Sequence, residues 1–156
     1  MKQVFWAGFW TFLLDQASKY LVVHWLNLRE LGEITPIPGF LNLRMAWNYG
    51  INFGLFSQDS DLTRWVLVAV ALVISGAVLW WTQHEEDGWP AHVSAGLLVG
   101  GALGNVVDRL LYGAVADFLN VTCCGLNNPY SFNIADIAVF AGALGLVIFG
   151  GAKKPS

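Results

Sequence analysis

Four long apolar segments dominate the order of hydrophobic and polar positions along the chain, at residues 4–23, 65–81, 92–111 and 134–150. Each has about 17–20 residues, the length that an α-helix needs to cross the hydrocarbon core of a bilayer. The first segment is too long for a signal-peptide core, carries the polar sequence DQASK near its end, and lacks a small-residue cleavage site. We therefore predict four transmembrane helices, the first of which is retained.

Two shorter segments between these helices predict β-strands. Residues 40–48, FLNLRMAWN, alternate apolar and polar positions, and residues 115–121, VADFLNV, show a similar alternation. A period of two is typical of a half-buried strand. The first and third connections lie on the same side of a membrane when four helices cross it. The pattern therefore predicts a mostly α-helical membrane protein with a small β platform on one side.

Composition strengthens the membrane interpretation. The hydrophobic share of the chain is 56% and the charged share is 12%, whereas charged residues make up about 25% of a typical soluble domain. The mean hydropathy is +0.54. We expect one integral membrane domain over residues 1–156. The net charge of −3 argues against a nucleic-acid partner, and the distribution of Lys and Arg leaves the orientation in the membrane open.

Ionisable residues inside a membrane helix cost at least about 2.5–3.5 kcal/mol each, so each one indicates a function. Asp15 and Lys19 are four residues apart, which places them on one helix face where they can pair. The pair could anchor a helix end or belong directly to a site, and the sequence leaves both interpretations open.

The sequence GGALGNVVDRL combines small and polar residues in the third apolar segment. Its glycines, at positions 100, 101 and 104, allow another helix to approach closely. Asn105 shares a helix face with Asp108 and Arg109. Arg109 remains protonated and favours a carboxylate or an anionic head group as its partner. We expect these three polar residues either to clamp the bundle together or to support a site.

Asn48 and Gly50, in the sequence WNYGINFG, follow the first predicted strand. Glycine and asparagine both tolerate unusual backbone angles. The segment is therefore either a simple turn or a loop that faces a polar ligand. The adjacent cysteines, Cys123 and Cys124, have no metal-ligand spacing, and we expect them to be small loop residues.

Two further aspartates have apolar neighbours. Asp136 begins the fourth apolar segment, where a helix N-terminus stabilises a carboxylate, and Asn133 precedes it on the same face. Asp117 lies in the second predicted strand. Two carboxyl groups held together can share one proton, so that one acts as a base toward water while the other donates to a carbonyl oxygen. This chemistry hydrolyses a peptide bond without a covalent nucleophile, and we predict no metal and no cofactor.

The motifs DQASK, NYGINFG, GGALGNVVDR, VADF and FNIAD resemble, in order and spacing, those of the lipoprotein signal peptidases, or signal peptidase II. The resemblance covers residues 15–136 and implies a membrane aspartyl endopeptidase that needs no metal. Its catalytic aspartates fall on Asp117 and Asp136. The family's remaining motif residues fall on Asp15, Lys19, Asn48, Gly50, Asn105, Asp108, Arg109 and Asn133. Asn52 departs from the small residue that is usual in the second motif.

The resemblance also implies a substrate and a location. The family removes the signal peptide from diacylglyceryl-modified prolipoproteins, cutting before the lipidated cysteine. It works in the bacterial inner membrane, with the termini in the cytoplasm, and this makes the β platform extracytoplasmic and the active site periplasmic. We expect a monomer that contacts membrane lipids. The alternatives are a small proton-coupled transporter or channel, and a structural membrane subunit in which the acids serve stability alone.

Overall fold

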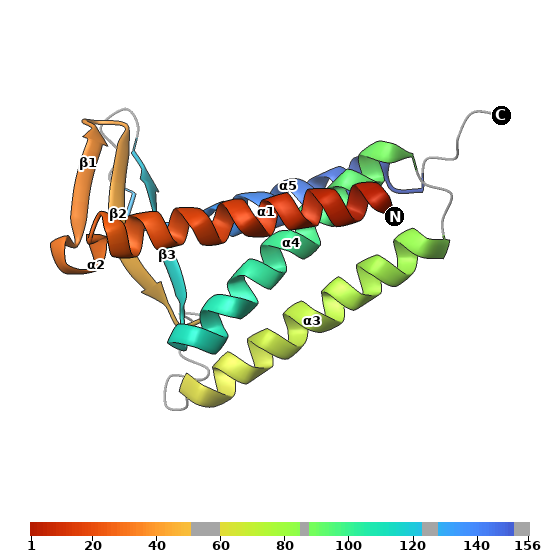
Figure 1. Cartoon of the computed structure of the whole chain (residues 1–156), viewed down its shortest axis with the longest axis horizontal. Helices are drawn as coiled ribbons and strands as arrows, with labels where there is room; N and C mark the ends of the chain where they lie inside the picture. Colours follow the sequence, from red (N-terminus) through yellow and green to blue (C-terminus); the bar gives the residue numbers. More distant parts are fainter. Residues whose placement is uncertain (51–59, 85–87, 123–127, 152–156) are drawn as a thin grey trace.

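The computed structural model describes residues 1–50, 60–84, 88–122 and 128–151 (Figure 1). Four long helices run along the molecule, and they coincide with the four predicted apolar segments. Their bounds are Lys2–Tyr20 for α1, Ser60–His84 for α3, Trp89–Tyr112 for α4 and Ile134–Phe149 for α5. A π-helical segment, η1 (Leu21–Trp25), extends α1, and a single turn, α2 (Leu28–Leu31), follows it.

Helix α4 is the centre of the bundle, because α1, α3 and α5 all pack against it. Small residues make these contacts close. A Cβ atom on Gly100 would meet the backbone of Gly8 in α1, and one on Gly101 would meet the carbonyl oxygen of Ala135 in α5. The glycines of GGALGNVVDRL therefore act as predicted, by admitting two neighbouring helices to the backbone of α4.

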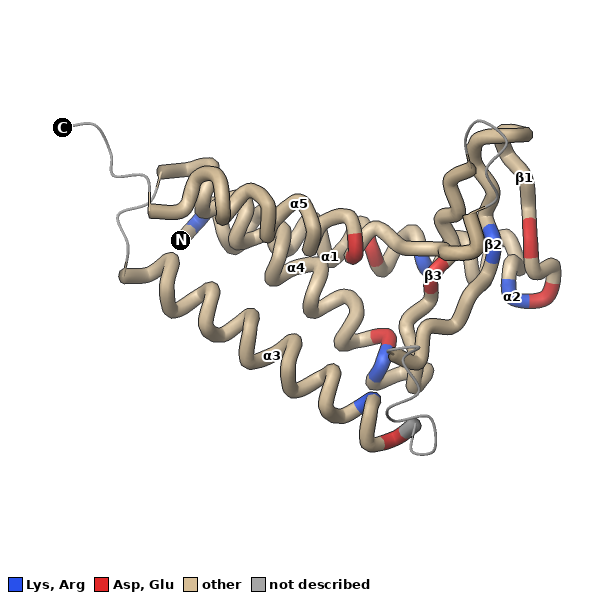
Figure 2. Tube along the Cα trace, turned by 180° about the vertical axis from the view of Figure 1, so that it is seen from behind, with Lys and Arg blue, Asp and Glu red and all other residues tan. Residues whose placement is uncertain are grey.

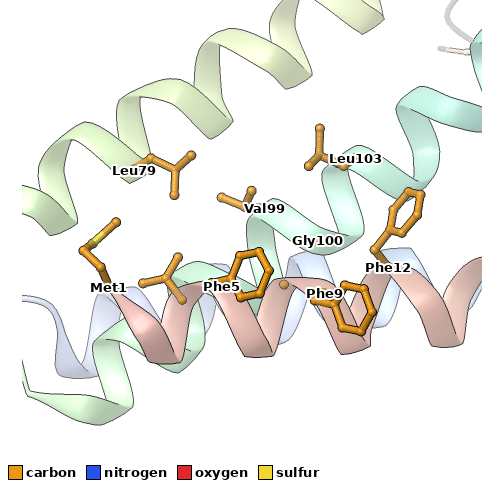
Figure 3. A pocket seen from close by; sticks show the side chains of 10 residues that line it. Met1, Phe5, Phe9, Phe12, Leu79, Val99, Gly100 and Leu103 are labelled. Atoms are coloured by element: carbon orange, nitrogen blue, oxygen red, sulfur yellow. The ribbon is translucent and has the colours of Figure 1, made fainter.

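Helix α3 packs chiefly against α4, and an apolar cavity of about 510 Å³ lies between α1, α3 and α4. Figure 3 shows Phe5, Phe9 and Phe12 of α1 on one side of this cavity, with Leu79 of α3 and Leu103 of α4 across from them. The residues that line the cavity are all apolar.

A three-stranded antiparallel sheet closes one end of the bundle (Figure 1), in the order β1 (Glu33–Ile37), β2 (Leu41–Asn48), β3 (Val115–Val121). The two predicted strands are confirmed as β2 and β3. The sequence did not predict β1, nor the helical turn α2. Pro36 lies within β1 and Pro38 directly follows it, at a sheet edge that tolerates the missing N–H.

The sheet packs against the end of α1 through a small core of Val22, Leu28 and Phe118. Phe118 is 2% exposed, and its neighbours Val115 to Asp117 are equally buried on both faces of β3. The alternation expected for β3 is therefore lost in its first half, because helices cover one face and η1 and α2 cover the other. A register shift between Leu43 and Ala46 also interrupts the alternation of β2.

Within the described residues, two helices are long and apolar enough to cross a membrane: Asp61–His84 and Trp89–Tyr112. Helix α5 is a shorter apolar helix, and α1 does not meet the same criterion because polar residues interrupt it. The structure thus confirms a helical protein with apolar helices and a small sheet, and the expectation of four spans is met in part. Cys123, Cys124 and Asn52 lie outside the described residues.

Candidate active site

Strand β3 carries Asp117 into the junction between the sheet and the helices. Its pairing partner is Ala46 on β2, so Asn48 lies two residues along on the same face. The Asn48 side-chain amide donates to Asp117 Oδ2 at 3.1 Å. The backbone N–H of Gly50 donates to Asn48 Oδ1 at 3.0 Å, which fixes the amide with its nitrogen toward Asp117.

Gly50 holds this turn in place by its backbone geometry. Its φ of +123° lies in a region that favours glycine, and a Cβ atom there would lie 2.8 Å from side chains of Leu67 and Thr63 on α3. The choice between a turn and a ligand-facing loop was made for residues 47–54, of which the structure describes residues 47–50. In its described part, up to Gly50, the chain turns after β2 and Asn48 contacts the candidate site; residues 51–54 lie outside the described residues.

Helix α5 begins with a capping box that places Asp136. Asn133 is the N-cap residue, and its Oδ1 accepts a hydrogen bond from the backbone N–H of Asp136 at 2.8 Å. In return, Asp136 Oδ2 accepts from the backbone N–H of Asn133 at 3.2 Å. The reciprocal bonds satisfy N–H groups that a helix start leaves unpaired. They also fix the carboxylate at the end of the helix that faces the sheet.

Asn133 joins the two carboxyl groups. Its side-chain amide is fully buried and donates to Asp117 Oδ1 at 2.7 Å, while its other contacts hold Asp136. The remaining oxygen of Asp136, Oδ1, accepts from the side-chain amide of Asn105 on α4 at 2.8 Å. All four carboxyl oxygens of the pair therefore accept a hydrogen bond, and three asparagines fix the orientation of both groups.

Lys19 lies behind the pair as a buried cation. Its Nζ is 2.8 Å from Asp15 Oδ2 and 2.8 Å from Asp108 Oδ2. It also donates to Asn105 Oδ1 at 3.2 Å, so the Asn105 nitrogen must face Asp136. The predicted Asp15–Lys19 pair is confirmed, and a second carboxylate completes it.

Asp15 and Asp108, the two acids bound to Lys19, each accept a hydrogen bond from the backbone. The donor is in each case the residue directly before Asp136 or Asp117. Asp15 Oδ1 accepts from the backbone N–H of Ala135 at 2.9 Å. Asp108 Oδ2 accepts from the backbone N–H of Ala116 at 3.1 Å. A single cation is thus connected, through one carboxylate on each side, to the backbone next to both Asp117 and Asp136.

Burial and charge shift the proton affinity of Asp117, which is 3% exposed. Burial, followed by the negative charge of Asp136, raises the pKa of Asp117 to about 7. The hydrogen bond from Asn48, the charge of Lys19 and the hydrogen bond from Asn133 oppose the shift without cancelling it. Asp117 therefore holds a proton up to neutral pH.

Arg109 and Asp108, which the sequence placed in one polar group with Asn105, bind different partners. Asp108 pairs with Lys19, whereas Arg109 donates from Nη1 to the backbone carbonyl of Asn105 at 3.3 Å. The Nε atom of Arg109 is buried, and no described residue bonds to it. The side chains of consecutive helical residues point in different directions, so Asp108 and Arg109 lie on different faces of α4.

Sequence reasoning missed Gln16. Its side-chain amide donates to Asp15 Oδ2 and to Asp108 Oδ1, each at 3.1 Å, and so links α1 to α4. The signal was present, because Gln16 is a polar residue between two functional candidates in an apolar helix.

The histidines lie elsewhere: His92 contacts the carbonyl of Gly88. Among the described residues, no group of three His, Cys, Asp or Glu side chains could hold a metal ion.

The chain is similar to a well-defined family. A model of the signal peptidase (SPase) II family matches residues 8–150. A lipoprotein signal peptidase of Sphingopyxis alaskensis is 39% identical over 136 residues, which are 87% of this chain and 78% of that protein. A lipoprotein signal peptidase of Rhizorhabdus wittichii is 42% identical over 137 residues, again 87% of this chain and 78% of that protein.

Two solved structures of bacterial membrane enzymes share the fold. One is 26% identical and superposes with a TM-score of 0.80, covering 95% of this chain and 92% of the other. The second is 25% identical with a TM-score of 0.77, covering 100% of this chain and 94% of the other. The likeness therefore extends over the sheet as well as the helices.

Proposed function

Because the chain belongs to the signal peptidase II family, we propose that it is an aspartic endopeptidase whose catalytic residues are Asp117 and Asp136. The proposed substrates are diacylglyceryl-modified prolipoproteins, which it cuts before the lipidated cysteine to release the signal peptide. The observation that carries the proposal is the bridge made by Asn133, which holds both carboxyl groups in one hydrogen-bonded unit.

The proposed reaction uses one proton shared between the two acids. Asp136 removes a proton from a water molecule, and the resulting hydroxide adds to the scissile carbonyl carbon. Asp117, whose pKa is raised to about 7, donates its proton to the carbonyl oxygen. The tetrahedral diol then collapses as Asp136 passes its new proton to the leaving nitrogen and Asp117 regains a proton from a diol hydroxyl. The pair ends in its starting protonation state.

The three asparagines serve this cycle as fixed donors. Asn48 and Asn133 donate to Asp117, and Asn105 donates to Asp136. Each carboxyl oxygen keeps a second lone pair for water or substrate. Because the amides do not titrate, they orient the pair equally well before and after proton transfer. Arg109 and Lys19 add positive charge nearby without replacing these contacts.

We propose that all four long helices cross the bacterial inner membrane, with the termini in the cytoplasm and the sheet in the periplasm. Large apolar side chains of α1 and α5 are exposed, among them Trp6 at 54% and Phe140 at 73%, as expected for surfaces that face lipid. The pair at the sheet end would then lie at the membrane surface, where a lipidated cysteine is held. We propose a monomer surrounded by lipid.

The distribution of charge favours hydrolysis at the surface over transport across the bilayer. Figure 2 shows that the charged residues gather at the sheet end of the helices. In the described parts of the helices, the far half carries one of them, Lys2 at the terminus. A proton pathway needs ionisable or polar groups along the span, so this arrangement does not favour the transporter alternative.

Cleavage of a synthetic diacylglyceryl-modified prolipoprotein peptide by the purified, detergent-solubilised protein tests the proposal. We expect mass spectrometry to show a cut before the modified cysteine. Asp117→Asn and Asp136→Asn should each lower the rate at least about a thousandfold without unfolding the protein. Asp61→Asn, at an exposed acid outside the site, is the control and should retain activity. Substantial turnover by Asp117→Asn or Asp136→Asn, or loss of activity to a chelator, would reject the mechanism.

A further inference from the structure

A second, small cavity lies near the sheet end of the bundle. It has a volume of about 160 Å³ and is lined by Arg29 of α2, Trp47 of β2, Tyr49 and Tyr112 of α4. Figure 1 shows α2 beside the sheet at the end of α1. The cavity therefore brings together three segments that are far apart in the sequence, and it combines one cationic side chain with three aromatic rings.

This cavity is separate from the candidate active site. Ala46 pairs with Asp117, and Asn48 contacts Asp117. These two positions of β2 therefore lie on the face toward Asp117 and Asp136. Trp47 and Tyr49 alternate with them and point to the opposite face. The ring of Trp47 lies 5.5 Å from that of Tyr112, measured between centroids. No member of the cavity takes part in the hydrogen-bonded network around the dyad.

Within the part of the chain that the structure describes, no acid compensates the charge in the cavity. Arg29 is exposed, and no described carboxylate lies within 4.0 Å of its guanidinium. Glu30 follows it directly, but consecutive side chains on a helical turn diverge. A guanidinium binds phosphate oxygens through two parallel hydrogen bonds and prefers such anions to a compact counter-ion. An arginine without a described carboxylate partner, in an aromatic cavity, thus has the chemistry to bind a phosphate ester.

The surroundings place the cavity at the depth of lipid head groups. Trp25, which ends η1, is 77% exposed, and Leu111, next to Tyr112, is 67% exposed. Tyr20 and His24 lie with Tyr112 in one aromatic group at the same level. Aromatic rings concentrate where the hydrocarbon core meets the polar head groups.

We propose that this cavity binds the phosphodiester head group of a membrane glycerophospholipid. Arg29 binds the phosphate, the rings of Trp47 and Tyr112 contact the glycerol, and the acyl chains run along the exposed apolar sides of η1 and α4. This lipid is a resident of the protein surface and not the substrate, so the site goes beyond the proposed peptidase activity. It would hold the sheet at a fixed height above the bilayer.

Binding of phosphatidylglycerol to the full-length protein in a neutral detergent tests the site. Native mass spectrometry or a thermal-shift titration would report the dissociation constant. We expect Arg29→Gln to weaken binding about tenfold, the loss of one charge-assisted contact to phosphate. Arg44→Gln removes another exposed arginine, on β2 outside the cavity, and should bind as the unaltered protein does. Tyr112→Leu should weaken binding through the lost ring without changing the charge.

Two further ligands show separately what the phosphate and the acyl chains contribute to binding. Diacylglycerol with the same acyl chains should not distinguish Arg29→Gln from the unaltered protein, because it has no phosphate. Soluble glycerol phosphate should bind far more weakly than the lipid, because it has no chains. Equal weakening by Arg29→Gln and Arg44→Gln, or full binding of glycerol phosphate, would overturn the proposal. Asp117→Asn should bind phosphatidylglycerol normally, so the outcome does not depend on the peptidase mechanism.

Discussion

At the scale of single residues, Lys19 holds three other polar side chains in place. It neutralises Asp15 and Asp108, and its third contact orients Asn105. All three partners in turn hold the dyad or the backbone beside it. Since Lys19 and the two acids are almost fully buried, removing the cation leaves two carboxylates without compensation in a medium that solvates them poorly.

Lys19→Met should therefore destabilise the protein by about 3–5 kcal/mol. We expect a large fall in the midpoint of thermal unfolding in detergent. Adding Asp108→Asn to this variant should restore part of the loss, because one uncompensated charge is then removed. The control is Lys2→Met, at an exposed lysine near the terminus. An unchanged midpoint in Lys19→Met would show that the ion pairs contribute nothing to stability.

At the scale of elements, one asparagine connects a helix start with a strand. Asn133 uses its oxygen to cap α5 and its nitrogen to hold Asp117 on β3. These two roles can be separated by substitution, because serine is also a good N-cap residue but has no amide nitrogen to donate.

Asn133→Ser should keep the melting temperature near that of the unaltered protein and lower kcat about tenfold or more, through the lost donor to Asp117. Asn133→Ala should lose the same activity and, in addition, about 1 kcal/mol of stability because the cap is lost. Thermal unfolding and single-turnover cleavage of the two variants would separate these effects. Equal activity of Asn133→Ser and the unaltered protein would contradict the bridging role.

The contacts of α4 with α1 make a second prediction at this scale. Gly100→Ala would drive a methyl group into the backbone of Gly8, and we expect a loss of about 1–3 kcal/mol from overpacking. Gly76→Ala, on α3, meets nothing within 4 Å and should be neutral or slightly stabilising. Comparison of the two unfolding midpoints provides the measurement. Similar midpoints would show that α1 and α4 are not in close contact.

The sequence predicted the elements whose signals are strong and local. Long apolar runs located α3, α4 and α5, and alternation located β2. It missed β1 and α2 because both are short, and because β1 contains Pro36, a residue that is uncommon within strands. It grouped Asp108 with Arg109 and Asn105 on α4, because their spacing was visible, whereas the approach of Lys19 from α1 to Asp108 was not. Gln16 was overlooked for the same reason: its partners on α4 are 88 and 92 residues away.

At the scale of the whole molecule, most of the charged residues that the structure describes lie at the sheet end, and the apolar helices fill the rest (Figure 2). This separation explains how a strongly apolar chain keeps so many buried acids. The sheet and the helix ends provide the hydrogen bonds that each carboxylate needs, and an apolar bundle anchors them at a fixed level. The central claim is that Asp117 and Asp136 then share one proton in a single reacting unit.

The single-turnover rate of peptide cleavage, measured against pH, tests that claim most directly. A pair that must carry one proton gives a bell-shaped profile. The rate should rise from acidic pH as the doubly protonated pair loses a proton. It should fall as the pH increases through about 7, where Asp117 loses the proton that it must donate. A rate that rises through one histidine-like pKa and stays high at alkaline pH would contradict the shared-proton dyad.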